Sequence, residues 1–153
     1  MEAAGTREQA RERPSLVLNR TYPVAPEKVW RAWTDPQALK QWFGPGETSS
    51  VELAEIDLRT GGRYHIRFRT PDGEVHDVSG IYREVLDNRK LVFTWAWKST
   101  PERVSLVSID LKAQGASTEL VFRHEQFFDQ AARDRHEQGW SATFVKLERF
   151  LTI

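Results

Sequence analysis

The chain contains no cysteine and carries no net charge, and each absence excludes a class of protein. Without cysteine there is no disulfide framework, no thiolate nucleophile and no Cys-ligated zinc or iron–sulfur site. The 22 Lys and Arg side chains balance 22 Asp and Glu side chains, so no overall field favours nucleic acid, although a local basic patch could form. No segment approaches the roughly 18 apolar residues of a membrane span. We therefore expect neither nucleic acid nor a membrane as a partner.

The first 14 residues are charged and small, end at Pro14, and lack the apolar core of a signal peptide. We expect residues 1–14 to be a flexible tail and residues 15–153 to form one domain of a cytoplasmic protein. A chain of this length buries roughly 70% of its unfolded surface, so it needs no covalent staples.

Alternation of apolar and polar residues predicts an antiparallel sheet. In 63–70, Tyr64, Ile66 and Phe68 share one face and arginines occupy the other. Turn residues recur about every dozen positions and predict six or seven strands. The best-defined strands are expected at 15–22, 63–70, 75–86, 91–97 and 117–125. Segment 48–58 has no clear apolar face, so it is either an edge strand or a strand whose faces cannot be assigned from the sequence.

Along the sequence, helical signals follow the first predicted strand and the last one. Pro26 favours the start of a short helix, and Asp35 and Pro36 are typical of the cap and first residue of a second one, which would carry Trp42 and Phe43. From residue 129 onward the apolar period becomes helical. The stripe consists of Trp140, Phe144, Leu147 and Leu151, with His136 one turn earlier. This pattern predicts one long C-terminal helix.

One helix is too narrow to cover such a sheet. A helix is about 10–12 Å wide, whereas the sheet face is roughly 20 Å across. The sheet must therefore curl, helped by Gly80, and large side chains, the short helices or a ligand must fill the remaining space. Six tryptophans and eight phenylalanines could simply fill a core, or could line a partly open apolar pocket. We expect a pocket lined by Trp42, Tyr64, Phe68, Phe93, Trp95, Phe122, His124, Trp140 and Phe144.

Histidines are the main polar candidates. Alternation places His124 on the same face as Phe122, where it could bind a ligand oxygen or act as a general acid or base. The alternative is a core histidine bonded to a backbone carbonyl or a neighbouring hydroxyl. His136 could meet the mouth of the cavity or face water. His65 is expected on the outer face of the sheet and His76 on a strand surface.

Other charged residues leave alternatives open. Strand parity could direct Glu84 and Asp110 inward, where a carboxylate could abstract a proton, and a surface or ion-paired role is the alternative. The row Arg63, Arg67 and Arg69 is either a solvated sheet face or a docking face for an acidic partner.

Several familiar kinds of site are missing from the sequence. Segment 135–140 has adjacent His and Glu but lacks the second histidine of a zinc helix. The glycines at 44–46 follow a helix instead of opening one, so no phosphate loop is predicted. No nucleophile elbow surrounds any serine. We expect no metal, no cofactor and no nucleotide, and an enzyme is less expected than a binding protein.

An ordered series of motifs extends along the chain from residue 15 to 153. It consists of RTYPVAPEKVWRAWTDPQALKQWF (20–43), GGRY (61–64), GIYREV (80–85), LVFTWAW (91–97), STELVFRHEQF (117–127) and GW (139–140). The series resembles the START-like (SRPBCC) superfamily and, within it, the domain related to the C-terminal part of the activator of Hsp90 ATPase (AHSA1).

This resemblance implies an α+β helix-grip (START/Bet v1-like) fold, in which a curved antiparallel sheet wraps around a long C-terminal helix. It also implies a hydrophobic cavity between helix and sheet that binds varied apolar ligands. Some relatives are enzymes of aromatase or cyclase type. The eukaryotic activator engages its chaperone with an additional N-terminal domain, which has no equivalent in the first 14 residues here.

We therefore expect a protein that binds a lipid-like or aromatic small molecule, as a monomer or a weak homodimer. One alternative is an interaction module that contacts a chaperone of the Hsp90 type. A second alternative is a cyclase or hydratase that uses His124 with Glu84 or Asp110.

Overall fold

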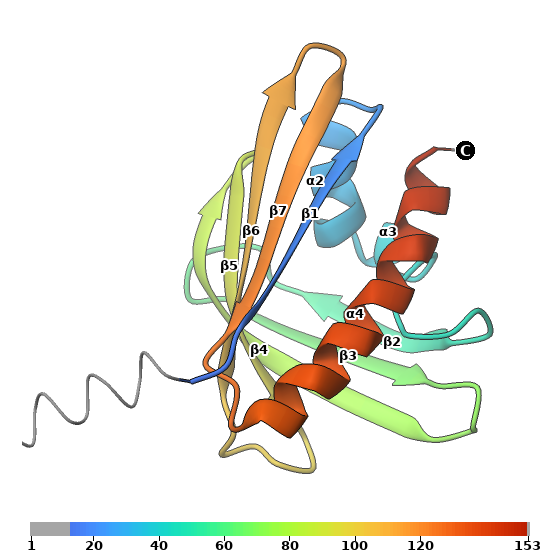
Figure 1. Cartoon of the computed structure of the whole chain (residues 1–153), viewed down its shortest axis with the longest axis vertical. Helices are drawn as coiled ribbons and strands as arrows, with labels where there is room; N and C mark the ends of the chain where they lie inside the picture. Colours follow the sequence, from blue (N-terminus) through green and yellow to red (C-terminus); the bar gives the residue numbers. More distant parts are fainter. Residues whose placement is uncertain (1–12, 153) are drawn as a thin grey trace, which may run out of the picture.

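The structure is a computed structural model that describes residues 13–152. A seven-stranded antiparallel sheet curves around one long helix, and two short helices follow the first strand (Figure 1). The strands are β1 (Leu16–Tyr22), β2 (Ser50–Ile56), β3 (Arg63–Arg69), β4 (Val75–Leu86), β5 (Lys90–Trp97), β6 (Ser105–Gln114) and β7 (Ser117–Glu125). The helices are α2 (Pro26–Thr34), α3 (Pro36–Leu39) and α4 (Gln130–Leu151). The predicted helix-grip fold is confirmed, whereas the predicted tail, 1–14, lies almost wholly outside the described residues.

The strand order is β1-β7-β6-β5-β4-β3-β2, so the chain meanders from β2 to β7 and β1 pairs with β7. β2 is an edge strand, one of the two alternatives that the sequence left open. Its register shifts between Val51 and Leu53. Because a bulge changes which residues face inward, this shift explains why the segment lacks a clean alternation.

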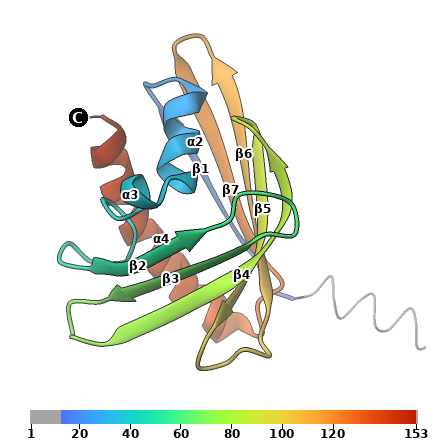
Figure 2. The same cartoon turned by 180° about the vertical axis from the view of Figure 1, so that it is seen from behind.

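The sheet bends sharply where β4 meets β5, and Figure 2 shows β2, β3 and β4 crossing the direction of β5, β6 and β7. A Cβ atom on Gly80 would lie 1.9 Å from the carbonyl oxygen of Thr94, so only glycine allows this close approach. The Thr94 hydroxyl accepts a hydrogen bond from the Ile81 N–H at 2.8 Å, and the Tyr64 hydroxyl donates to the Thr94 carbonyl at 2.5 Å. These bonds satisfy backbone groups at the bend.

The two short helices differ in part from the prediction. Asp35 caps α3 as expected, because its carboxylate accepts the Gln37 N–H at 2.9 Å. However, α3 ends at Leu39, so Trp42 and Phe43 follow the helix instead of belonging to it. Both are still buried, and the Trp42 indole donates to a carbonyl of α2 at 3.0 Å.

The long helix α4 begins after Asp129, whose carboxylate accepts the Ala132 N–H at 2.8 Å. Its predicted apolar stripe is buried against the sheet. The chain between α3 and β2 is tied to α4 by Lys146, whose ammonium donates to the carbonyls of Gly44 and Gly46 at 2.9 and 3.0 Å. No helix in residues 13–152 combines the length and apolarity needed to cross a bilayer.

Glu84 and Asp110, which strand parity could have placed inside, face outward. Glu84 pairs with Lys90 at 3.6 Å, because the register of β4 shifts between Tyr82 and Glu84. Asp110 is exposed between the buried Ile109 and Leu111. Neither carboxylate can act on a group in the interior.

The outer face of the sheet carries alternating charges. Arg67 and His65 both bind Asp77, at 3.0 and 2.7 Å, and Arg69 pairs with Glu52 at 3.1 Å. Acidic residues on neighbouring strands therefore neutralise much of the predicted basic row, which favours a solvated face over a docking face.

Candidate ligand cavity

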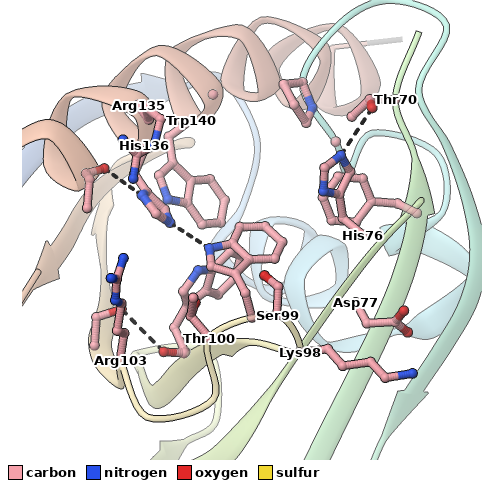
Figure 3. Close-up of a pocket in the computed structure, with 18 of the residues that line it drawn as sticks. Thr70, His76, Asp77, Lys98, Ser99, Thr100, Arg103, Arg135, His136 and Trp140 are labelled. Carbon is pink, nitrogen blue, oxygen red and sulfur yellow. Dashed lines mark hydrogen bonds between the residues drawn. The ribbon is translucent and has the colours of Figure 1, made fainter. Parts of the chain in front are cut away.

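A cavity of about 1020 Å³ lies between the N-terminal half of α4, the adjoining ends of β3 and β4, β5 and the loop 98–104 (Figure 3). Its aromatic lining residues are Phe43, Phe68, Trp95, Trp97, Phe127, Phe128 and Trp140. From α4 the lining residues are Ala132, Arg135, His136, Gly139, Trp140 and Thr143, a helical stripe. The volume is in the range of sites for small molecules. The void expected beside Trp95 and Trp140 is present.

Three rings close the inner end of this cavity. Trp95 lies 5.1 Å from Trp140, and Phe43 lies 6.3 and 6.1 Å from these two rings, between ring centroids. We call these three residues the ring partition. Behind it is a void of about 20 Å³, which is only large enough for a water molecule.

The nine predicted lining residues separate into three groups. Phe68, Trp95 and Trp140 line the cavity. Tyr64 and Phe93 line the small inner void, together with Trp95 and Trp140. Trp42, Phe122, His124 and Phe144 line neither space. All four are buried. Trp42, Phe122 and Phe144 belong to a packed core behind the partition, whereas His124 lies behind the wall of the cavity itself, with its ring 4.2 Å from that of Phe127.

His124 has no solvent exposure, and protein groups occupy both of its ring nitrogens. Nδ1 accepts the Trp140 indole N–H at 3.1 Å, so Nε2 carries the proton and donates to the Ser105 hydroxyl at 2.7 Å. Burial holds the pKa of His124 well below its usual range, which keeps the ring neutral. Of the two roles considered from the sequence, the structure therefore shows the second: His124 is a core histidine bonded to a neighbouring hydroxyl.

The Ser105–His124 pair has the wrong polarity for nucleophilic catalysis. A catalytic histidine offers a lone pair to the serine hydroxyl and donates its other N–H to an acid. Here the ring donates to Ser105 and accepts from Trp140, and the Ser105 hydroxyl is 3.3 Å from the Trp95 carbonyl, to which it donates. Because Glu84 and Asp110 lie on the outer face, the acid–base mechanism with His124 is not assembled.

His136 spans the cavity between α4 and β5. Its Nδ1–H donates to the Ala132 carbonyl at 2.7 Å, and Nε2 accepts the Trp97 indole N–H at 3.0 Å (Figure 3). Burial lowers the pKa of His136, so the neutral ring is favoured. The sequence left open whether His136 meets the cavity or faces water, and in the structure it lines the cavity.

Sequence reasoning placed His76 on a strand surface, but it lines the cavity. Its ring stacks on Phe68 with centroids 5.3 Å apart, and Nε2 lies 3.2 Å from the Thr70 hydroxyl. A usable signal was present, because His76 has the same parity in β4 as the buried Val78 and Tyr82.

Sequence reasoning did not identify the charged residues at the mouth of the cavity. Lys98 and Arg103 come from the loop between β5 and β6, and Arg135 comes from α4. A loop follows no periodic pattern, so its position over the sheet cannot be obtained from residue spacing. Among residues 13–152, no three His, Asp or Glu side chains gather in a way that could hold a metal ion.

Comparison with known proteins shows the family to which the chain belongs. The family described as "Activator of Hsp90 ATPase homolog 1-like protein" matches residues 23–152. A solved structure from Nitrosomonas europaea is 29% identical, with a TM-score of 0.77 over 90% of this chain and 94% of that one. The AHSA1 protein of Silicibacter pomeroyi is 28% identical, with a TM-score of 0.81 over 91% and 98% of the two chains.

A human protein, the activator of 90 kDa heat shock protein ATPase homolog 1, is 26% identical over 132 residues. The match covers 86% of this chain but 35% of the human protein, so the chain spans about a third of that relative.

Proposed function

The chain belongs to the activator of Hsp90 ATPase homolog 1-like family, and we propose that it binds an apolar small molecule in the cavity between α4 and the sheet. The observation that carries this proposal is the cavity of about 1020 Å³ with seven aromatic side chains in its walls. Displacing water from such walls is favourable by roughly 25 cal/mol for each Å² of apolar surface removed from solvent.

Hydrogen bonding within the walls supports an apolar guest. Both nitrogens of His136 are occupied, the Ser105 hydroxyl is held by His124 and the Trp95 carbonyl, and the Thr143 hydroxyl donates to Gly139 at 2.7 Å. These groups offer a guest few free donors. The main source of affinity is therefore contact with the rings.

Gly139 provides a direct test. It lies on the lining stripe of α4, and a Cβ atom added there would meet nothing within 4 Å. Gly139→Leu should stabilise the helix by about 0.5–1 kcal/mol and place a side chain where the guest would lie. We expect the affinity for the uncharged fluorescent probe N-phenyl-1-naphthylamine to fall at least about tenfold, while urea denaturation shows equal or higher stability.

Ala142→Leu is the matched control, because Ala142 is on the same helix but exposed. It should leave binding of the probe unchanged. The proposal is wrong if the unaltered protein does not bind the probe, or if folded Gly139→Leu binds it as well as the unaltered protein does.

We also propose contact with a chaperone of the Hsp90 type as a second function, supported by the similarity to the human activator over 132 residues. The test is the ATPase rate of an Hsp90-type chaperone with and without the protein. A higher rate would support this function, and an unchanged rate at saturating protein concentration would exclude it.

A further inference from the structure

Positive charge is concentrated at the mouth of the cavity. Three cationic side chains line the mouth, Lys98, Arg103 and Arg135. Among residues 13–152, none of the three has an ion-pair partner within 4 Å. The chain as a whole carries equal numbers of acidic and basic side chains, so this excess is local.

The acidic residues at the mouth do not cancel this charge. Asp77 is bound by Arg67 and His65 on the outer face of the sheet. Glu74 lies in the turn before β4, and His76 Nε2 lies 3.9 Å from its carboxylate. Glu74 alone opposes three cations.

Arg103 is oriented to bind an anion. Its guanidinium carbon lies 3.9 Å from the centre of the Phe128 ring. Stacking on an aromatic ring fixes the guanidinium plane and leaves the N–H groups at its edge free for an oxyanion. The backbone N–H of Arg103 donates to the Thr100 carbonyl at 3.0 Å, which supports the turn that carries it.

Figure 3 separates the three cations into two positions. Arg103 and Arg135 lie on the side of the cavity next to His136, whereas Lys98 lies on the far side beside Asp77. In this view the two arginines are on the same side of the cavity, and Lys98 is on the other side.

The geometry points to an amphipathic anion as the guest, with an apolar body against the rings and one carboxylate or sulfonate group held at the rim by Arg103 and Arg135. This inference rests on the proposed binding function and adds the chemical class of the ligand. An anion at the rim stays partly hydrated, so it loses little solvation while gaining charge-assisted hydrogen bonds.

A pair of probes with one body tests the inference. 8-Anilino-1-naphthalenesulfonate and N-phenyl-1-naphthylamine share the anilinonaphthalene rings, and only the first carries a negative charge. We expect the sulfonate to bind about tenfold more tightly at low salt. In 0.5 M salt this preference should shrink, because screening weakens the contribution of exposed charges.

Substitutions test whether the two arginines cause the tighter binding of the sulfonate. Arg103→Gln combined with Arg135→Gln should reduce the affinity for the sulfonate by about tenfold and leave that for the uncharged probe unchanged. Lys98→Gln is the comparison variant: it removes one cation from the other side of the same mouth and should lower the affinity for the sulfonate much less than the arginine variant does. Dodecanoate should displace the uncharged probe at lower concentration than dodecanol, which extends the result from sulfonate to carboxylate and from rings to chains.

Each outcome decides one claim. If the uncharged probe binds and the sulfonate binds no more tightly, the anionic guest is excluded while the proposed function stands. If neither probe binds, the proposed function is excluded. A loss in Lys98→Gln equal to that of the arginine variant would overturn the assignment to Arg103 and Arg135.

Discussion

The space on either side of the ring partition is bounded by the same sheet and the same helix, yet one side is packed and the other is open. Behind the partition, α2 packs against β6, β7 and α4, and α3 packs against β2, all on the concave side of the sheet (Figures 1 and 2). Phe122 there has its ring 4.6 Å from Trp140 and no solvent exposure. In front of the partition only a loop and the residues before α4 are available. Aromatic content alone therefore does not determine whether such a space is filled.

Polar groups differ between the inner wall of the cavity and its mouth. At the inner wall, Trp140, His124 and Ser105 form a chain of hydrogen bonds that occupies both nitrogens of the His124 ring. At the mouth, Arg103 and Arg135 have no ion-pair partner among the described residues. The His124 ring is thus satisfied within the protein, whereas the mouth presents charge to an incoming molecule.

The largest expected effect contrasts two phenylalanines, one from each region. Phe122→Ala removes a ring with no exposure from the packed region and should lower the free energy of unfolding by about 3–5 kcal/mol. Phe128→Ala removes a ring that is 58% exposed and should cost less than about 1 kcal/mol. Urea denaturation of both variants measures the difference. Equal losses would show that the two regions are packed alike.

The sequence predicted the fold well because its signals are local. Alternation in 63–70 and 117–125, the cap at Asp35 and the apolar stripe of α4 each depend on neighbouring residues. The predicted second helix was too long. Trp42 and Phe43 are buried just after the helix ends, and their apolar side chains give the same sequence pattern as buried residues within a helix.

The candidate site was predicted only in part, for a physical reason. Strand parity identifies which residues face inward, and Phe68, Trp95 and Trp140 were found in this way. Parity cannot show which inward-facing residues other side chains cover. Phe122, which packs against Trp33 of α2, and His124, which packs against Phe127, were therefore expected at the cavity but do not line it. The charged rim comes from a loop, which has no period to follow.

The second prediction concerns pH and uses the two histidines next to the cavity. Burial lowers the pKa of His124 and of His136, so the folded protein favours neutral rings, while the unfolded chain takes up protons below about pH 6.5. Stability should be complete above this pH and should fall as the pH decreases. Between pH 6.5 and 5.5 we expect a loss of about 1 kcal/mol from His124, whose pKa is held well below its usual range, and a smaller loss from His136, measured by urea denaturation.

His136→Gln separates the two contributions. It removes the histidine that lines the cavity and should leave the larger part of the pH dependence, which then reports on the fully buried His124. A stability that stays flat between pH 6.5 and 5.5 in the unaltered protein would contradict the lowered pKa values.

The smallest expected effect, that of Trp97→Phe, is seen by comparing two tryptophans that each donate an indole N–H to a histidine. Trp140→Phe leaves Nδ1 of the fully buried His124 without a donor, which should cost about 1–3 kcal/mol in addition to the lost ring contacts. Trp97→Phe leaves Nε2 of His136 facing the cavity, where water can replace the indole, so the polar part of the loss should be below about 1 kcal/mol. Denaturation measures both losses, and the histidine ring resonances in NMR spectra report the altered hydrogen bonds. A larger loss for Trp97→Phe than for Trp140→Phe would mean that water does not reach His136, and the cavity would then be closed to a guest at its proposed mouth.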